Sequence, residues 1–214
     1  MFKYNYVDEL KGEANFFNEM GSLAHLIFEL KDKGKITDCG KAWETGYIKR
    51  VRGHEQEWYE SWYMDCYSFF KSWNGHEQEA TWIEEHSVSD FGDFLFQGYV
   101  DRLHLGEKGF VITDYKVSKP FLKKDIVKKR RQLYLYSLFV KEKLGEYPAE
   151  LSFFFFRQNK KLNFDFNKSD YSEAIDWAKR TFERIQKEEE LLIKDGNDYF
   201  CSSVCSFRNI CEKR

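Results

Sequence analysis

The chain has 214 residues, and its 34 lysines and arginines nearly balance 36 aspartates and glutamates, which gives a formal net charge of −2. Hydrophobic residues make up 42% and aromatic residues 19% of the chain, a composition that excludes a disordered protein. No apolar run approaches the roughly 20 residues that a membrane-spanning helix needs. No leader sequence opens the chain, so we expect a cytoplasmic protein. The length favours a single domain over residues 1–214.

The spacing of apolar residues predicts two helices followed by three strands in the first half of the chain. One-sided apolar spacing extends over 14–30 and, with many aromatic residues, over 58–73, which indicates two amphipathic helices. Apolar and polar residues then approach alternation over 81–88, 94–105 and 109–117, as is typical of strands. The last two of these strands flank a glycine-rich turn and are predicted to form a hairpin.

The second half of the chain predicts a helix, two more strands and a final helix. A long helical pattern covers 122–143, strands are expected over 150–157 and 162–166, and the last helix over 169–193 with Ser169 as its N-cap. The order ααβββαββα predicts an α/β fold in which helices flank a central mixed β-sheet. The expected parts are an N-terminal helical part, a catalytic sheet with its helix, and a C-terminal helix with a cysteine-rich tail, at 1–80, 81–166 and 167–214.

Two carboxylates and a lysine are expected to converge on one face of the predicted sheet. Alternation along the strand at 109–117 places Asp114 and Lys116 on the same face. Asp101 lies on the preceding strand, across the hairpin. Carboxylates of this kind bind Mg²⁺ or Mn²⁺ for phosphodiester hydrolysis, and a lysine stabilises the negative charge that develops. The alternative is an ordinary solvated ion pair at the end of a strand.

Three further side chains extend this pattern. His25 lies beside the apolar stripe of the first helix, where an imidazole would add a nitrogen ligand and favour tolerance of Mn²⁺. The alternative for His25 is a hydrogen-bonded helix histidine. Gln132 and Tyr136 lie one turn apart on the long helix, where they would either hold a base or phosphate or be ordinary helix decoration.

Four short motifs, in this order along the chain, resemble the PD-(D/E)XK nuclease superfamily. They are Gly21-Ser-Leu-Ala-His25, Gly98-Tyr-Val-Asp101-Arg102, Thr113-Asp114-Tyr-Lys116 and Gln132-Leu-Tyr-Leu-Tyr136. More narrowly, the chain resembles the branch that holds the RecB and AddB nuclease domains and the CRISPR-associated exonucleases of spacer acquisition. The resemblance covers nearly the whole chain and implies a restriction-endonuclease-like core.

The resemblance implies a role for each matching residue of the metal centre. It makes His25, Asp101 and Asp114 the side-chain ligands of Mg²⁺ or Mn²⁺. The carbonyl of Tyr115 becomes a further ligand, and Lys116 becomes the catalytic lysine beside the two catalytic aspartates.

The resemblance also implies residues around this centre. Gln132 and Tyr136 match an element that lies beside the active site and the DNA path, which places them in the catalytic set. Relatives often carry an acidic residue on the strand before the catalytic hairpin. In this chain that residue is either Glu84 or Glu85.

Three cysteines near the C-terminus resemble part of an iron–sulfur site. In this branch Cys201, Cys205 and Cys211 correspond to three ligands of a [4Fe–4S] cluster whose fourth ligand precedes the first helix. The chain opens on a segment that resembles the stretch after that ligand, so we expect either a truncated N-terminus or a member that has lost the cluster. Cys39 and Cys66 lie in other motifs, and a structural zinc site also lacks ligands.

The charges are segregated along the chain. Residues 74–101 contain seven acidic residues and no lysine or arginine, and residues 116–131 contain eight basic residues against Asp125 alone. Such a basic run is either a solvated helix face or a track for phosphates beside the metal site. The residues expected to contact DNA are Lys119, Lys123, Lys124, Lys128 and Arg131.

These observations predict a metal-dependent deoxyribonuclease, an exonuclease acting on single-stranded DNA or DNA ends in repair, recombination, a phage or a CRISPR system. The abundant aromatic residues would stack on unpaired bases. The sequence contains no helicase motif, so unwinding would need a helicase, recombination or CRISPR protein as partner. The alternative is a non-catalytic nucleic-acid-binding or assembly module that keeps the fold.

Overall fold

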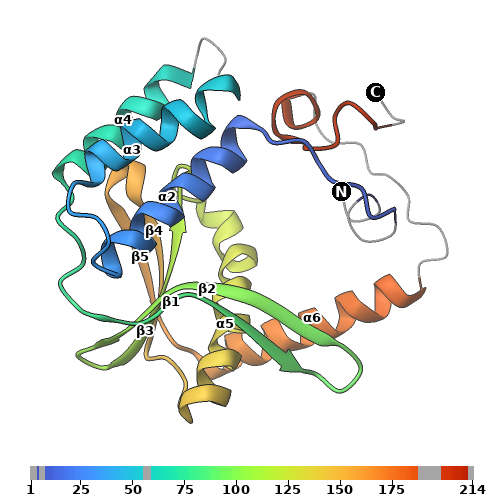
Figure 1. The fold of residues 1–214 in the computed structure, drawn as a ribbon. Coiled ribbons are helices and arrows are strands. Elements are labelled where there is room, and N and C mark those ends of the chain that lie inside the picture. The colour runs from blue at the N-terminus through green and yellow to red at the C-terminus, as the bar shows by residue number, and fades with distance from the viewer. Residues whose placement is uncertain (1–3, 5–7, 55–58, 188–198, 212–214) are drawn as a thin grey trace.

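The computed structural model of the chain describes residue 4 and residues 8–54, 59–187 and 199–211. Its centre is a five-stranded sheet in the order β1-β2-β3-β4-β5 (Figure 1). The strands are β1 (Ala80–Asp90), β2 (Leu95–Gly106), β3 (Gly109–Lys116), β4 (Glu150–Phe155) and β5 (Lys160–Asp165). Neighbouring strands are antiparallel except for β3 and β4, which are parallel. The sheet is therefore mixed, as the sequence predicts.

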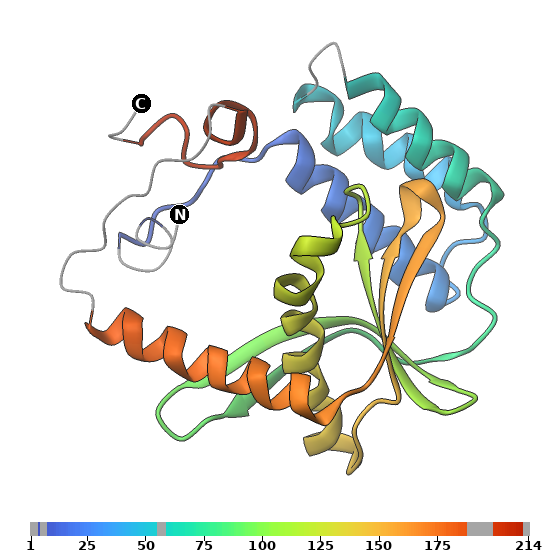
Figure 2. The same cartoon turned by 180° about the vertical axis from the view of Figure 1, so that it is seen from behind.

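Two groups of helices flank the sheet (Figures 1 and 2). The first group is α2 (Phe16–Asp32), α3 (Cys39–Arg50) and α4 (Glu60–Ser72); the second is α5 (Lys123–Leu144) and α6 (Lys168–Lys187). Short turns are η1 (Arg52–His54), η3 (Phe156–Gln158) and η4 (Phe200–Val204). The connection between β3 and β4 contains α5, because parallel strands need a long crossover. In the described part of the chain, none of the helices is both long enough and apolar enough to cross a membrane.

Consecutive phenylalanines in and after β4 alternate between two hydrophobic cores. Phe153 and Phe155 belong to the core that α5 covers, whereas Phe154 and Phe156 belong to the core beneath α2, α3 and α4. All four are at most 4% exposed. A parallel strand with helices on both faces of its sheet is apolar at nearly every position. This double burial explains why the segment is a continuous apolar run.

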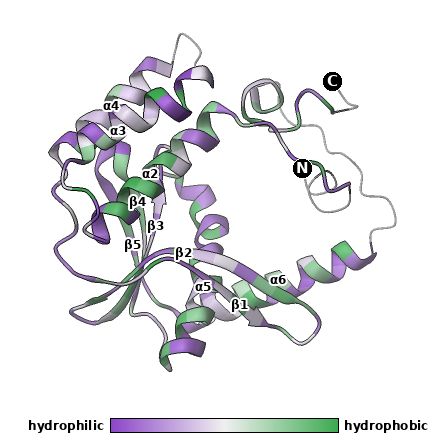
Figure 3. Ribbon diagram, in the orientation of Figure 1, coloured by the Kyte–Doolittle hydropathy of each residue, from purple (hydrophilic) through white to green (hydrophobic). Residues whose placement is uncertain are grey.

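Helix α2 carries the first of the predicted apolar faces. It begins after Asn15, whose side chain accepts a hydrogen bond from the amide of Asn18. Figure 3 shows hydrophobic segments along α2 where it lies beside the sheet. The prediction of a helix at 14–30 is confirmed with both ends two residues later. The buried residues of this face are Phe16, Met20, Leu23, Ala24, Ile27 and Phe28.

Helix α3 is an element that the sequence pattern misses. Its large buried side chains, Trp43 and Tyr47, share one row with Cys39, and most other positions are polar or charged. This row is too narrow to give the apolar stripe by which a helix is recognised. Asp38 accepts a hydrogen bond from the amide of Lys41 at 2.8 Å and caps the helix. The helices and strands described therefore follow the order αααβββαββα rather than ααβββαββα.

The N-cap predicted for the last helix is wrong by two residues. The side chain of Asn167, rather than Ser169, accepts hydrogen bonds from the amides of Ser169 and Asp170 at 2.8 and 3.1 Å. An amide oxygen caps a helix start as well as a hydroxyl does. The expected continuation of this helix to residue 193 and the expected start of the second helix at residue 58 lie outside the described residues.

The segment before α2 and the C-terminal tail lie side by side (Figures 1 and 2). The amide of Glu13 donates to the carbonyl of Ser206 at 2.7 Å, and Nδ2 of Asn15 donates to the carbonyl of Val204 at 3.0 Å. A Cβ at Gly12 would lie 2.6 Å from Cβ of Ser206, so this close approach requires glycine. The tail thereby holds the start of α2 in place.

Candidate metal centre

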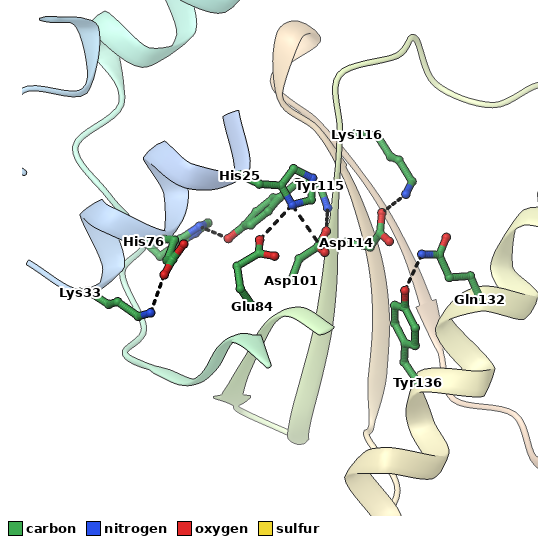
Figure 4. Close-up of polar contacts among 11 residues, drawn as sticks. His25, Lys33, His76, Glu84, Asp101, Asp114, Tyr115, Lys116, Gln132 and Tyr136 are labelled. Carbon is green, nitrogen blue, oxygen red and sulfur yellow. Dashed lines mark hydrogen bonds and ion pairs between the residues drawn. The ribbon is translucent and has the colours of Figure 1, made fainter. Parts of the chain in front are cut away.

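Three side chains from different elements bring potential ligand atoms together at one point (Figure 4). His25 from α2, Glu84 from β1 and Asp101 from β2 each offer an atom within 4.8 Å of the others. Nδ1 of His25 lies 2.9 Å from Oε1 of Glu84 and 3.6 Å from Oδ1 of Asp101. Among the described residues, this is the one group of three histidine, cysteine or acidic side chains with such geometry.

Asp101 is fixed between two strands that separate at the site. The backbone pairing of β2 and β3 runs from their shared turn to Arg102 opposite Thr113. One step further, the amide of Tyr115 donates to Oδ2 of Asp101 at 2.7 Å. The carboxylate accepts a hydrogen bond from a backbone N–H that would otherwise donate to a carbonyl of the neighbouring strand. This hydrogen bond therefore holds the carboxylate rigidly, and only 8% of Asp101 is exposed to solvent.

Strand β1 bends where it delivers Glu84. The pairs Ile83–Arg102 and Glu85–Val100 flank this residue, so Glu84 lies opposite Asp101 in the register. Its φ of 49° is in the left-handed region, which costs a residue with a side chain roughly 1–2 kcal/mol. Of the two glutamates that the sequence leaves open, Glu84 is the one at the site, and Glu85 pairs with Lys143 at 2.6 Å.

Asp114 and Lys116 share one face of β3, as strand alternation predicts, and Asp114 lies near enough to act electrostatically on Asp101 and His25. The ammonium of Lys116 forms an ion pair with Oδ2 of Asp114. Asp114 is 1% exposed, whereas the side chain of Lys116 is 27% exposed. The lysine thus connects a buried carboxylate to the surface of the site.

The site concentrates negative charge away from water. Burial, and then the neighbouring Asp114, raise the pKa of Asp101 to about 7. Burial also raises the pKa of Asp114, against the opposing effect of Lys116. Burial alone would lower the pKa of His25, but the carboxylates of Asp101 and Glu84 outweigh it and raise that pKa to about 9. Bound protons and the ammonium group of Lys116 therefore offset the negative charge of these carboxylates, as a bound metal cation would.

Gln132 and Tyr136 line the other side of the site, on α5 (Figure 4). Nε2 of Gln132 donates to the hydroxyl of Tyr136 at 2.8 Å. Burial raises the pKa of Tyr136 to about 12, and the carboxylates of Asp114 and Asp101 are near enough to contribute. A Cβ at Gly98 would lie 2.8 Å from Cε1 of Tyr136, so the glycine lets this ring cross β2 closely. The two residues that sequence motifs single out on the long helix do reach the site.

Comparison with known proteins decides the family. The family model described as the PD-(D/E)XK nuclease superfamily matches residues 1–212. The chain belongs to the PD-(D/E)XK nuclease superfamily. No curated protein matches the chain. The match is to the superfamily as a whole, and the mixed sheet flanked by helices is the core expected of it.

The donors present fit the divalent metal that PD-(D/E)XK nucleases typically use. One imidazole nitrogen and the carboxylates of Glu84 and Asp101 already surround one point, and Asp114 lies within electrostatic reach of His25. A hard cation such as Mg²⁺ or Mn²⁺ prefers this mixture of oxygen donors with at most one nitrogen. The carbonyl of Tyr115 stays a prediction as a further ligand.

A hollow of about 500 Å³ opens beside the metal centre of this nuclease fold. Its lining includes His25 and Glu84 together with Arg50 and Tyr99, two residues that the sequence analysis misses. Tyr99 is 56% exposed, and its ring centroid lies 4.8 Å from that of His86. The sequence gives the number of Trp, Tyr and Phe residues, but that number does not reveal which ring faces solvent at the site.

Two buried contacts hold the elements of the candidate metal centre in place. Arg102, next to Asp101 on β2, is 1% exposed and its Nε donates to Asp32 at the end of α2 at 2.9 Å. The ring of Tyr115 stacks on Phe28 of α2 with centroids 4.0 Å apart. These contacts set the distance between α2 and the sheet, and so between His25 and the carboxylates.

The basic segment of α5 is only partly available for a nucleic acid. Lys119, which precedes α5, and Lys123, Lys124 and Lys128 of α5 are exposed. Arg131 instead pairs with Glu173 of α6, at 2.7 Å from Nη2 to Oε1. The prediction that Arg131 contacts DNA therefore competes with this ion pair.

The cysteines divide into two groups. Cys39 and Cys66 are buried in the core beneath α2, α3 and α4, which removes both as ligands for the C-terminal tail. Cys201 is exposed and Cys205 and Cys211 are partly exposed. In the described structure these three do not form a group with ligand geometry. The iron–sulfur cluster stays a prediction.

Proposed function

We propose that the protein is a metal-dependent deoxyribonuclease, an exonuclease that hydrolyses phosphodiester bonds of single-stranded DNA or DNA ends. The observation that carries this proposal is the convergence of His25, Glu84 and Asp101 within 4.8 Å beside the ion pair of Asp114 with Lys116. Membership of a superfamily that consists mainly of nucleases supports the same reading. A purely structural ion pair would not need an imidazole and further carboxylates around one point.

The residues of the site divide the work of hydrolysis between them. His25, Glu84, Asp101 and Asp114 would hold the divalent cation, which polarises the phosphate and lowers the pKa of water when bound. Lys116 lies against Asp114 and reaches the surface, so its ammonium can stabilise the negative charge that develops on the phosphate as water attacks phosphorus. The backbone amide of Tyr115 keeps the Asp101 carboxylate oriented throughout.

The preference for unpaired strands rests on Tyr99. An exposed aromatic ring in the hollow beside the ligands provides a stacking surface for one base, worth about 1–3 kcal/mol. Bases in a duplex are already stacked and do not offer a free face. The exposed lysines of α5 would contact phosphates on the other side of the site.

The setting of this activity is part of the same proposal. We expect the enzyme in the cytoplasm, in DNA repair, recombination, a phage or a CRISPR system, together with a helicase or recombination protein that supplies single strands. A [4Fe–4S] cluster on Cys201, Cys205 and Cys211 would need a fourth ligand from outside the described tail.

Degradation of end-labelled single-stranded and duplex DNA with Mg²⁺ or Mn²⁺ tests the proposal. We expect Asp114→Asn and Lys116→Gln each to lower the rate at least about 100-fold, the usual effect of losing a group that stabilises developing charge. Asp90→Asn and Lys179→Gln, which change exposed residues, are matched controls outside the metal centre and the basic segment. A non-catalytic assembly module would leave the DNA intact in every variant, and equal rates in wild type and Asp114→Asn would show that the site lies elsewhere.

A further inference from the structure

A second groove, between α2 and α3, adjoins the hollow at the metal centre. Leu26 and Arg50 line both spaces. The groove has a volume of about 700 Å³, compared with about 500 Å³ for the hollow. Because the two spaces meet at Leu26 and Arg50, a chain-like ligand at the metal centre can pass over these side chains to the groove.

The rim of the groove is strongly basic. Four cationic side chains line it against a single carboxylate, Asp38, which caps α3. One of the four, Arg50, is ion-paired with Glu19 of α2, with Nε 3.4 Å from Oε2. Two of the lysines lie at the ends of one row of α3, two turns apart with Thr45 between them, and both are exposed. The cations are Lys35, Lys41, Lys49 and Arg50.

The floor of the groove is apolar and shallow. It consists mainly of leucine, isoleucine and alanine side chains of the two helices and their connection. Leu26 at the shared wall is 36% exposed. A Cβ at Gly46 would lie 2.3 Å from Cδ1 of Leu23, so the glycine brings α3 close to α2 and keeps the floor near the surface.

We propose that this groove binds the stretch of a single-stranded nucleic acid next to the phosphate at the metal centre, an inference that rests on the proposed function. Lys41 and Lys49 contact two phosphates of the strand about 12 Å apart along α3, since each helical residue rises about 1.5 Å. Arg50 contacts the phosphate nearest the metal centre, and the apolar floor receives the exposed faces of bases. A duplex has no such faces to offer.

Charge and continuity favour this occupant over others. The groove adjoins a hollow lined by His25 and Glu84, two of the candidate metal ligands, where the proposed substrate already places a phosphate. The row Lys41–Lys49 then prolongs that anionic path away from the site. An acidic protein segment would satisfy the same cations but has no reason to enter the metal centre.

Fluorescence anisotropy with oligothymidylates of about 4 and about 16 nucleotides, in EDTA to prevent cleavage, tests the groove. The test variant is Lys41→Gln/Lys49→Gln, and the control is Lys108→Gln/Lys179→Gln, which removes two exposed lysines from the β2–β3 turn and from α6. For the longer strand we expect the test variant to lose roughly 10- to 30-fold in affinity at about 0.1 M salt, and its salt slope to decrease by about 1.4. The control should keep the wild-type values.

The outcomes separate this inference from the function on which it rests. If wild type cleaves and binds DNA while the groove variant matches the Lys108/Lys179 control, the groove assignment is overturned and the nuclease stands. If wild type neither binds nor cleaves DNA, both are overturned. If a polyglutamate peptide binds wild type and loses affinity in the groove variant while the oligonucleotide does not, the groove takes an acidic protein segment instead.

Discussion

Replacing Asp101 with asparagine should stabilise the metal-free protein and abolish its response to metal. Burial and Asp114 raise the pKa of this carboxyl from 3.8 to about 7, which corresponds to an upper limit of about 4 kcal/mol of destabilisation when it is ionised. Asparagine keeps an acceptor for the amide of Tyr115 but removes the charge that attracts His25. We therefore expect a net gain of about 1–3 kcal/mol in the free energy of unfolding at pH 8.

Urea denaturation with and without Mn²⁺ measures both effects. Wild type should gain stability when Mn²⁺ is added, because an ion that binds only the folded state stabilises it, and Asp101→Asn should gain little. The control Asp90→Asn replaces an exposed carboxylate that accepts the amide of Gly92 and should stay within about 0.5 kcal/mol of wild type. The reasoning is refuted if Asp101→Asn is no more stable than wild type without metal, or responds to Mn²⁺ as wild type does.

The metal-free wild-type protein should lose stability as the pH rises. Asp101 binds its proton more tightly in the folded protein. The stability that this group contributes to the metal-free wild type is therefore complete below pH 3.8 and is lost as the pH rises to about 7. His25, with its pKa raised from 6.5 to about 9, contributes stability that is complete below pH 6.5 and lost as the pH passes 9. Urea unfolding curves from pH 5 to 9 should show a declining free energy of unfolding. Asp101→Asn should reduce this decline at the lower end of that pH range.

Three substitutions around the site test its other parts. Tyr99→Ala should weaken binding of single-stranded DNA roughly 5- to 150-fold by loss of stacking, measured by anisotropy, while Tyr99→Phe keeps the affinity. Gly98→Ala should destabilise the protein by about 1–3 kcal/mol in urea, because the new methyl displaces the ring of Tyr136. Lys123→Gln should flatten the salt dependence of DNA binding more than Arg131→Gln, whose charge is already paired.

A specific result would contradict each of these three predictions. Equal loss of affinity in Tyr99→Ala for single strands and duplex would show a role other than stacking. Gly53→Ala is the control for the glycine, since a Cβ there meets no atom within 4 Å; equal destabilisation in both would remove the steric argument. A larger salt effect for Arg131→Gln would mean that its pair with Glu173 opens when DNA binds.

Short-range sequence patterns predicted the features that depend only on residues close together in the chain. The pairing of Asp114 with Lys116 follows from strand alternation alone, because residues two apart in a strand share a face. The apolar stripe of α2 likewise predicted both the helix and its buried face. Helix α3 escaped prediction because tertiary packing on α2 and α4, rather than a broad apolar stripe, stabilises it.

Sequence motifs predicted which residues belong to the site but not how they meet. His25 and Glu84 are 59 positions apart, and the choice of Glu84 over Glu85 depends on a single left-handed residue in β1. No periodicity reports such a bend. The competition of Glu173 for Arg131 was likewise invisible, since it depends on how α6 packs against α5.

The amino-acid sequence by itself determined the family and the mixed α/β core and predicted most of the residues of the candidate metal centre, because these depend on local periodicity and on short motifs. The tertiary structure decided that Glu84 joins the centre, that Arg131 is paired, and that Arg50 and Tyr99 line its hollow. It also showed that the basic rim of the α2–α3 groove adjoins the site. Those features arise from contacts between elements distant in the chain, and burial and charge at such contacts are properties of the folded molecule.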